Sequence, residues 1–461
     1  MNLAKKRWVT LIACCFINLC LGSIYVWSVF ASSMAEFLSA HNGVSLTTAD
    51  LAIVYTVANS VGPITMITGG WFNDKFGPKK VILAGGLMVG IGMIASGFAT
   101  SVGMLVVTYG LIFGLGLGMT YGTAVSSCMK FFPDKRGLIG GITTAIYGLG
   151  SVILPPVVTL IASKSSAPTA FKIVGIAFLL IICGCSFLME QCPADFKPEG
   201  WNPPAAMKQG GAENKNWKEM LKTPVFYVML LLFTCGAFSG MMVISQASAV
   251  AANMVGMTAV MASTAVSVLA VFNASGRILA GLLSDRIGRI STLTIATVLG
   301  VAGLLLLYFT GEGGYVTFYI GIAGIGLSFG SFMGVYPGFT ADQFGAKNNS
   351  VNYGIMFIGL AAAGYFGPSA MRSIYRADGA YGRAFLVAAA FGAAGFALTF
   401  VYRFSPIRER EESKNGKKIS AFMSAHHPGK CHLPQPHVCF SDWSHRHRQR
   451  LCARRADKGL L

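Results

Sequence analysis

The stretch VFNASGRILAGLLSDRIGR, residues 271–289, places Arg277 in an otherwise apolar run, and the next acidic residue along the chain is Asp285. A guanidinium can hold a carboxylate through two parallel hydrogen bonds, and it stays ionised at any biological pH. An embedded charge costs about 2.5–3.5 kcal/mol on insertion scales, so it normally has a partner or faces a watery cavity. Arg277 is therefore the first candidate for binding a small anion.

The sequence offers Arg277 no acidic partner inside an apolar segment. Asp50, Lys130, Asp342 and Arg372 all fall near segment ends. At a rise of about 1.5 Å per residue, Arg277 lies about 12 Å from Asp285 and so near the middle of a bilayer. The counter-ion is most simply the ligand itself. A structural arginine bonded to backbone carbonyls is the alternative.

The elements that must position Arg277 are apolar segments of membrane-spanning length. Of the 461 residues, 54% are hydrophobic and 12% charged, with a mean hydropathy of +0.60. Continuous apolar runs of about 20 residues cross a bilayer as helices, whereas a barrel would alternate. We predict an all-α membrane protein with twelve transmembrane helices, over residues 8–31, 48–70, 81–100, 103–128, 138–161, 170–189, 224–250, 258–282, 291–310, 315–338, 351–371 and 382–402.

A hydrophilic loop divides these segments six and six. We expect an N-terminal six-helix bundle over 1–189, a cytoplasmic linker loop over 190–223 and a C-terminal six-helix bundle over 224–403. Residues 404–461 form a basic tail with six of the seven histidines and three cysteines. We expect this tail to be disordered, or even a translation artefact, because its spacings match no zinc site.

The two halves repeat each other. GGWFNDKFGPKK and AGLLSDRIGR share a glycine, an aspartate four residues later and a second glycine three residues after that. Glycines recur at every fourth position in two segments, where they predict close helix packing: Gly110, Gly114, Gly118 and Gly122, then Gly326, Gly330, Gly334 and Gly338. With the motif aspartates Asp74 and Asp285 aligned, the counterpart of Arg277 is Met66. The second half alone has a cation at this depth.

The basic tail inflates the net charge of +18, and the basic residues before it concentrate on alternate loops. This positive-inside pattern predicts that both termini are cytoplasmic, and it argues against a nucleic-acid partner. We expect an integral protein of the plasma (inner) membrane. No nucleophile, paired carboxylates or metal-ligand cluster lies within the segments, so we expect no enzyme activity, no cofactor and no metal.

Twelve segments, a central linker and the doubled loop motif resemble the major facilitator superfamily. Within it, LGSIYVWSVF, KFFPDKRG, NASGR and NYGIMF resemble the oxalate:formate antiporter family. The resemblance implies the major facilitator fold, in which two pseudo-symmetric six-helix bundles rock about a site at the bilayer midplane.

The resemblance also implies a cytoplasmic latch. In the superfamily the motif aspartate braces helix ends across the two halves, so Asp74 would face the start of the eleventh span and Asp285 the start of the fifth, near Arg136. A carboxylate there meets the positive end of a helix dipole. An ordinary loop salt bridge is the alternative. The expected latch residues are Gly70, Asp74, Gly77, Arg136, Gly281, Asp285 and Gly288.

In the resembling family, an arginine at the place of Arg277 binds the substrate carboxylate, and a lysine lies eight residues after the asparagine of the NYG motif. Counting from Asn352 leads to Leu360 instead. One cation rather than two favours a monoanion such as formate, pyruvate or lactate over oxalate. The positions that resemble the family's aromatic cage are Tyr25, Trp27, Tyr121, Tyr147, Phe332 and Tyr336, with Tyr353 and Gln246 as weaker candidates.

We therefore expect a monomeric secondary active transporter of small carboxylate anions, working by alternating access as an anion exchanger. An empty Arg277 should resist reorientation, which favours exchange. A proton-coupled monocarboxylate symporter is the first alternative, ranked second because no carboxylate or histidine is visible inside the spans. A non-transporting carboxylate sensor is the other alternative.

Overall fold

The computed structural model describes residues 3–48, 50–193, 196–198, 201 and 214–404. Regular secondary structure in these residues is helical throughout, as the sequence predicts. The expected tail, except for Phe404, and much of the expected linker lie outside the described residues.

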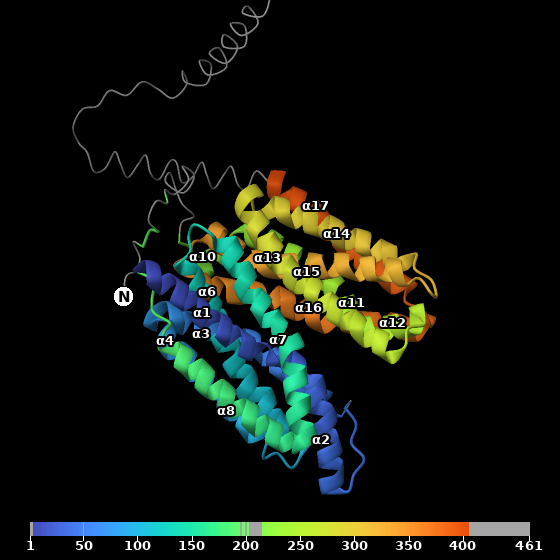
Figure 1. Ribbon diagram of the computed structural model, residues 1–461. Coiled ribbons are helices and arrows are strands. Elements are labelled where there is room, and N and C mark those ends of the chain that lie inside the picture. The colour runs from blue at the N-terminus through green and yellow to red at the C-terminus, as the bar shows by residue number, and fades with distance from the viewer. Residues whose placement is uncertain (1–2, 49, 194–195, 199–200, 202–213, 405–461) are drawn as a thin grey trace, which may run out of the picture. The chain divides into compact units, whose positions relative to one another are not determined.

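The first half contains six spans, two of which are built from several pieces (Figure 1). A 3₁₀ segment, η1, interrupts the first span where Gly22 contacts Gly150 of the fifth; a Cβ on Gly150 would lie 2.7 Å from the Gly22 Cα. A π-helical segment, η2, interrupts the fourth. The elements are α1 (Leu3–Leu21), η1 (Gly22–Val26), α2 (Trp27–Asn42), α3 (Ala52–Phe76), α4 (Pro78–Ser96), α5 (Val102–Leu105), η2 (Val106–Phe113), α6 (Gly114–Lys130), α7 (Arg136–Lys164) and α8 (Ala167–Ser186).

The second half repeats this arrangement after a short helix at the end of the linker. That helix begins with a capping box between Asn216 and Glu219. The short helix is α10 (Trp217–Leu221). The elements of the second half are α11 (Pro224–Ile244), α12 (Ala247–Val255), α13 (Ala259–Ile287), α14 (Arg289–Tyr308), α15 (Tyr315–Phe344), α16 (Asn349–Asp378) and α17 (Gly382–Phe404).

Eleven helices of the described residues are long and apolar enough to cross a membrane, against twelve predicted. The segment predicted over 48–70 forms α3, which is helical over 25 residues but is not among the eleven. It carries polar residues that bond within the helix: Thr56, Asn59, Ser60 and Thr68 each donate to the carbonyl four residues earlier. This polarity makes α3 the least membrane-like of the predicted spans.

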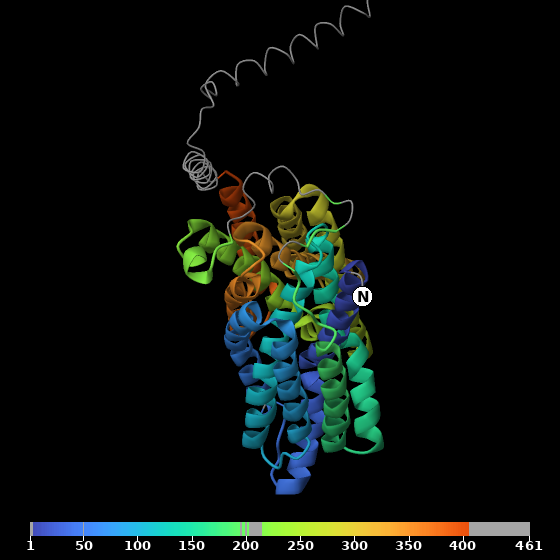
Figure 2. The ribbon, with the colours of Figure 1, turned by 90° about the vertical axis from the view of Figure 1, so that its left-hand side faces the viewer.

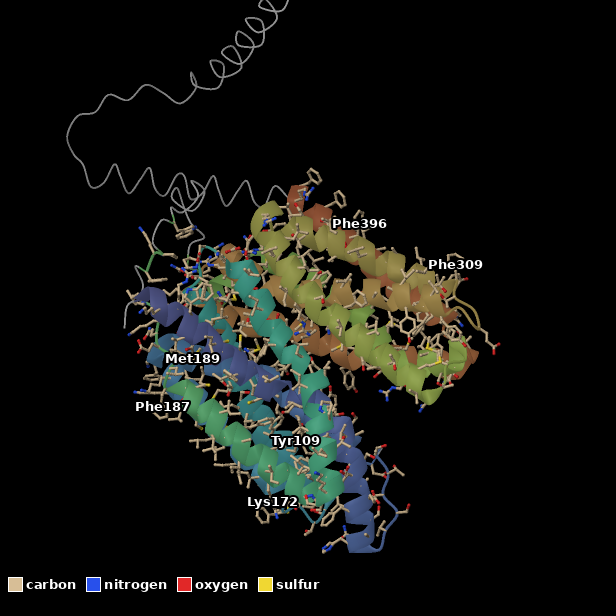
Figure 3. All side chains as sticks on the ribbon, in the orientation of Figure 1. Tyr109, Lys172, Phe187, Met189, Phe309 and Phe396 are labelled. Carbon is tan, nitrogen blue, oxygen red and sulfur yellow. The ribbon has the colours of Figure 1, made fainter. Side chains whose placement is uncertain are left out.

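Large apolar side chains cover much of the outside of the helices (Figure 3). Phe309 at the end of α14 is 78% exposed and Leu180 on α8 is 68% exposed, whereas Tyr109 lies fully buried among the helices of the first half. Acyl chains solvate such side chains and water does not. The exposed surface therefore suits a lipid environment.

The two glycine ladders are helix contacts. Those of η2 and α6 pack on α3, where a Cβ on Gly114 would lie 2.7 Å from the Ala58 Cα. The first three of α15 pack on α13, where a Cβ on Gly334 would lie 2.9 Å from the Arg277 Cα, and Gly338 lies against Arg289 and Arg136. Glycine is needed at both places because the backbones touch. The second ladder thereby fixes the backbone that carries Arg277.

The two halves meet mainly along three helix pairs, α7 with α13, α7 with α15 and α3 with α16. Arg7 of α1 bonds Asp134 in the turn before α7, so the start of the chain lies beside that turn (Figure 2). We call this the near end; it also holds Asp74 and Asp285. The opposite end, with Asn42 and Tyr308, is the far end.

Candidate functional site

Arg277 lies midway along α13 and is fully buried. Its backbone is enclosed on two sides, because a Cβ on Gly141 of α7 or on Gly334 of α15 would collide with the Arg277 carbonyl. The side chain therefore points into the helical bundle and not toward acyl chains.

Two hydrogen bonds hold the guanidinium. Nε donates to the Asn273 Oδ1 over 3.1 Å, and Nη1 donates to the Thr144 carbonyl of α7 over 2.5 Å. No acidic residue in the described ranges forms an ion pair with Arg277. A guanidinium has five N–H donors. Two are used by neutral acceptors, so the positive charge has no counter-charge among the described residues.

Gly148 of α7 leaves room for the guanidinium. A Cβ there would lie 3.4 Å from the Arg277 Cζ and 3.6 Å from both Nη atoms. These similar distances place residue 148 over the guanidinium group. A methyl group would make ordinary van der Waals contact, whereas a longer side chain would displace the charged group.

Three tyrosines surround the charge. Tyr121 of α6, Tyr147 of α7 and Tyr353 of α16 all lie within electrostatic range of Arg277. The Tyr121 and Tyr147 rings lie 4.9 Å apart. The buried hydroxyls of Tyr121 and Tyr353 lie beside each other, and neither has another hydrogen-bond partner within the described part of the chain. Two hydroxyls that face each other satisfy only one of their two donors, so the site can take a further hydrogen-bond acceptor.

Tyr25 extends this group toward the far end. Its ring lies 5.6 Å from that of Tyr147, edge to face, and its side chain is 37% exposed. Phe357 of α16 completes the cluster, with ring centroids 5.7 Å from Tyr121 and 5.8 Å from Tyr353. Both halves thus contribute aromatic rings around the charge.

Three expected cage residues are placed elsewhere. Trp27 packs against Tyr109 within the first half, with ring centroids 4.5 Å apart. Tyr336 stacks on Phe233 of α11 at 4.1 Å and donates its hydroxyl to the Met229 carbonyl. Phe332 packs against Gly236, which also belongs to α11.

The helical period explains the placement on α15. Gly334 is the residue that touches Arg277, and positions 332 and 336 are turned about 200° away from it. They therefore face α11, where they contribute to packing. Of the weaker candidates, Tyr353 joins the site. Gln246 precedes α12 and has no hydrogen bond to Arg277 in the described structure.

Sequence reasoning missed the neutral residues that hold Arg277. Asn273 is one helical turn before it, so the i, i+4 spacing could have indicated the contact. The Thr144 carbonyl and Gly148 leave no signal in the sequence, because both depend on how α7 packs against α13. Leu360, where the resembling family has lysine, is buried and 7% exposed.

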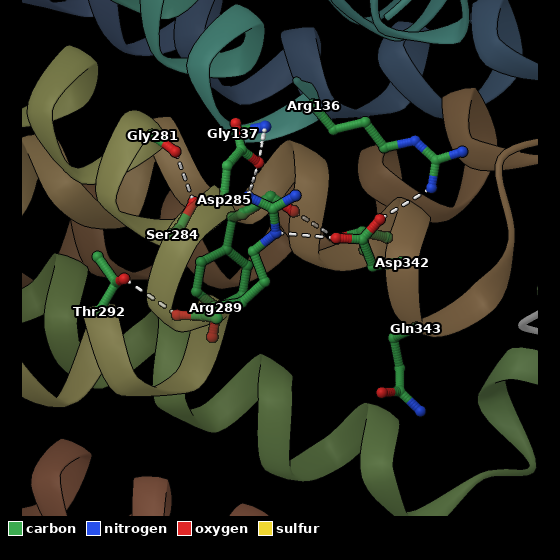
Figure 4. A network of polar contacts seen from close by, with 12 residues as sticks. Arg136, Gly137, Gly281, Ser284, Asp285, Arg289, Thr292, Asp342 and Gln343 are labelled. Atoms are coloured by element: carbon green, nitrogen blue, oxygen red, sulfur yellow. Dashed lines mark hydrogen bonds and ion pairs between the residues drawn. The ribbon is translucent and has the colours of Figure 1, made fainter. Parts of the chain in front are cut away.

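At the near end, Asp285 caps α7. Its two carboxylate oxygens accept hydrogen bonds from the backbone N–H groups of Gly137 and Leu138, at 2.9 and 2.8 Å (Figure 4). Those N–H groups lack partners within the helix, and the helix dipole favours a negative charge beside them. Gly281 permits the approach, because a Cβ there would collide with the Gly137 carbonyl.

A chain of ion pairs continues from Asp285. Arg289 bonds Asp285 at 2.7 Å and Asp342 at 2.8 Å, and Asp342 also bonds Arg136 at 2.8 Å (Figure 4). Arg136 belongs to the first half and Asp342 to the second. The network therefore ties α7 to α13, α14 and α15, and it adds Arg289 and Asp342 to the expected latch residues.

The corresponding contact in the first half also lies at a helix start, because Asp74 lies against Ser350 and Val351 of α16. Asp74 pairs with Lys130 at 3.0 Å, and Lys130 also donates to the Lys347 carbonyl of the second half. Asn73 donates to the Ser350 hydroxyl at the start of α16, at 2.7 Å. A Cβ on Gly70 would lie 2.7 Å from the Ser350 carbonyl carbon.

Gly77 and Gly288 make the sharp turns after the motif aspartates. Their φ angles are +84° and +90°, values that favour glycine. Each ends one helix and caps the next: α3 and α4, then α13 and α14.

Contacts between the halves run from the near end to the level of Arg277. The Arg277–Thr144 hydrogen bond and the Tyr121–Phe357 ring contact are the farthest from the near end. The structure is thus closed at the near end.

The protein has two helical halves with a lipid-compatible surface, and these halves meet around a buried charge. This arrangement is that of a membrane transporter. Residues 16–368 and 235–452 match the Major Facilitator Superfamily. The oxalate:formate antiporter of Oxalobacter formigenes is 30% identical over 404 residues, which cover 87% of this chain and 92% of that protein. The uncharacterized MFS-type transporter YhjX of Escherichia coli K12 is 30% identical over 363 residues, covering 78% and 86%.

A solved structure supports the same fold. The proton:xylose symporter XylE superposes with a TM-score of 0.66 at 15% identity, covering 88% of this chain and 97% of that one. The chain belongs to the Major Facilitator Superfamily and resembles its oxalate:formate antiporter branch, as the sequence motifs predict.

Proposed function

We propose that this transporter carries small monocarboxylate anions of the formate, pyruvate or lactate type. The observation that carries the proposal is the buried Arg277 charge, which has two neutral hydrogen-bond acceptors and no acidic partner in the described structure. A carboxylate would supply both the missing charge and a hydrogen-bond acceptor for the paired Tyr121 and Tyr353 hydroxyls.

The number of cations favours a monoanion. Arg277 is the cation of the candidate site, and Leu360 occupies the position where the resembling family has a lysine. A dianion would keep one charge uncompensated in a desolvated site, which costs several kcal/mol. The name of the Oxalobacter formigenes relative supports carboxylate transport by this branch, and the loss of one cation favours its monovalent substrate.

Anion exchange is the mode that the charge favours. Without a substrate, Arg277 must cross a dry constriction with its charge uncompensated when the halves rock. With a bound carboxylate the pair is neutral. Reorientation of the loaded form is therefore faster, and we infer that the near end, closed here by the Asp285 contacts, is the cytoplasmic side.

Uptake into proteoliposomes tests the proposal. Purified protein should exchange labelled formate, pyruvate or lactate for the unlabelled anion, and it should exchange oxalate poorly. A pH gradient should not drive uptake in the absence of an internal anion. Uptake that depends on such a gradient would favour the proton-coupled symporter instead, and binding without movement would favour the sensor.

Two substitutions connect the activity to the site. We expect Arg277→Ala to abolish exchange, and Arg277→Lys to impair it strongly because lysine lacks the planar fork. Near-normal exchange by the alanine variant would contradict the proposal.

A further inference from the structure

Asn273 determines which donors of Arg277 remain available. It lies one turn before Arg277 on α13, and its Oδ1 accepts from Nε at 3.1 Å. Its position is fixed, because a Cβ on Gly330 of α15 would collide with the Asn273 carbonyl. The amide is therefore held against the guanidinium by the packing of two helices.

The bond between Asn273 and Nε determines which edge of the guanidinium a carboxylate can bind. A carboxylate can bind in two-point fashion either along the Nε–Nη2 edge or along the Nη1–Nη2 edge. The bond to Asn273 occupies Nε. The Thr144 carbonyl uses one of the two N–H groups of Nη1, so the donors that remain, one on Nη1 and two on Nη2, all lie on the side away from Nε.

We propose that Asn273 is a positioning and specificity-determining residue: it directs the substrate carboxylate to the Nη1–Nη2 edge and, because it is neutral, leaves the Arg277 charge to the substrate. This rests on the proposed function. Tyr121, Tyr147 and Tyr353 are the titratable groups that face Arg277 from α6, α7 and α16, and α15 presents glycine backbone.

The Asn273→Asp variant tests the second part of the proposal. The new side chain has nearly the same shape, but at neutral pH it supplies a negative charge one turn from Arg277 that competes with the substrate. At about pH 7.5, where a carboxyl group is ionised, we expect at least about a tenfold loss of formate affinity. The adjacent guanidinium favours the ionised carboxyl, so uptake should recover only below about pH 4, where protonation restores a neutral neighbour, relative to the unmodified protein.

The Asn273→Ala variant tests the first part. It keeps the site neutral but frees Nε, so the guanidinium loses its fixed orientation. We expect affinity to fall about ten- to hundredfold, as for a lost hydrogen bond to a charged group, with no new pH dependence. Asn253→Asp is the matched control, because it makes the same chemical change on α12, where Asn253 bonds Tyr381 instead.

The outcomes separate this inference from the function on which it rests. Unchanged formate affinity and pH profile in Asn273→Asp would overturn the role of Asn273, even if Arg277→Ala abolishes exchange. Normal exchange by Arg277→Ala would instead overturn the proposed function. If Asn273→Asp does not fold, judged by its thermal unfolding in detergent, the affinity of Asn273→Ala decides, and an unchanged value would contradict the proposal.

Discussion

At the scale of single residues, a charge and its surroundings define the site. Arg277 is buried without an acid in the described structure, and the residues that hold it are an amide and a backbone carbonyl. The sequence suggests either a ligand as the counter-ion or a structural arginine bonded to backbone carbonyls. A backbone carbonyl does bind the arginine, yet three of its five N–H donors remain for a ligand.

The buried tyrosine hydroxyls should contribute to substrate affinity. Removing either hydroxyl, in Tyr121→Phe or Tyr353→Phe, should weaken formate binding about tenfold, because each can donate to an ionised carboxylate. Tyr336→Phe is the control. Its hydroxyl bonds the Met229 carbonyl, so we expect a loss of about 1 kcal/mol in the free energy of unfolding with unchanged affinity. Equilibrium binding measures the affinity for formate, and thermal unfolding measures the stability of each variant. Equal affinities in all three variants would contradict the placement of Tyr121 and Tyr353 at the substrate.

The space at Gly148 should limit side-chain size. Gly148→Ala should retain exchange, since the added Cβ would lie 3.4 Å from the Arg277 Cζ. Gly148→Leu should reduce exchange at least about tenfold, because its side chain would displace the guanidinium. The exchange rate per purified protein measures this effect, and full activity of the leucine variant would show that the guanidinium does not lie against residue 148.

At the scale of elements, apolar length predicts the spans well and their breaks poorly. The predicted run 8–31 lies within α1 to α2, but the 3₁₀ interruption at Gly22–Val26 arises where α1 crosses α7, which is a tertiary contact. In the same way, Phe332 and Tyr336 occur at suitable depths, yet the rotation of α15 directs them to α11. Depth can be counted along a sequence, whereas helix rotation and crossing depend on partners far along the chain.

The near-end network should favour the conformation described here. Asp342→Asn removes the ion pairs to Arg136 and Arg289. For such partly exposed pairs we expect a cost of about 1 kcal/mol, which changes the ratio of closed to open near ends about fivefold. Spin labels at Lys135 and Arg286 should then report a larger population at long distance.

The Asp378→Asn variant is the matched control for this measurement. It removes the pair between Asp378 and Arg383, which lies within the second half at the far end. We expect it to leave the label distances unchanged. An unchanged distribution in Asp342→Asn would mean that the network does not hold the near end closed.

At the scale of the whole molecule, the two halves meet at the near end and around Arg277. The Arg277–Thr144 bond itself joins the halves, so the charge that a substrate would neutralise lies at a contact between them. We therefore expect release of labelled formate from liposomes to be at least about tenfold slower without external anion than with it. Equal release under both conditions would rule out obligatory exchange.

The most direct measurement is equilibrium binding of labelled formate and pyruvate to purified protein and to its Arg277→Gln variant, which keeps hydrogen-bonding capacity but has no charge. If the substrate is the counter-ion of Arg277, the variant should bind at least about a hundredfold more weakly, since two charge-assisted hydrogen bonds are lost. Equal affinity in the two proteins would contradict the claim that the cargo neutralises this arginine.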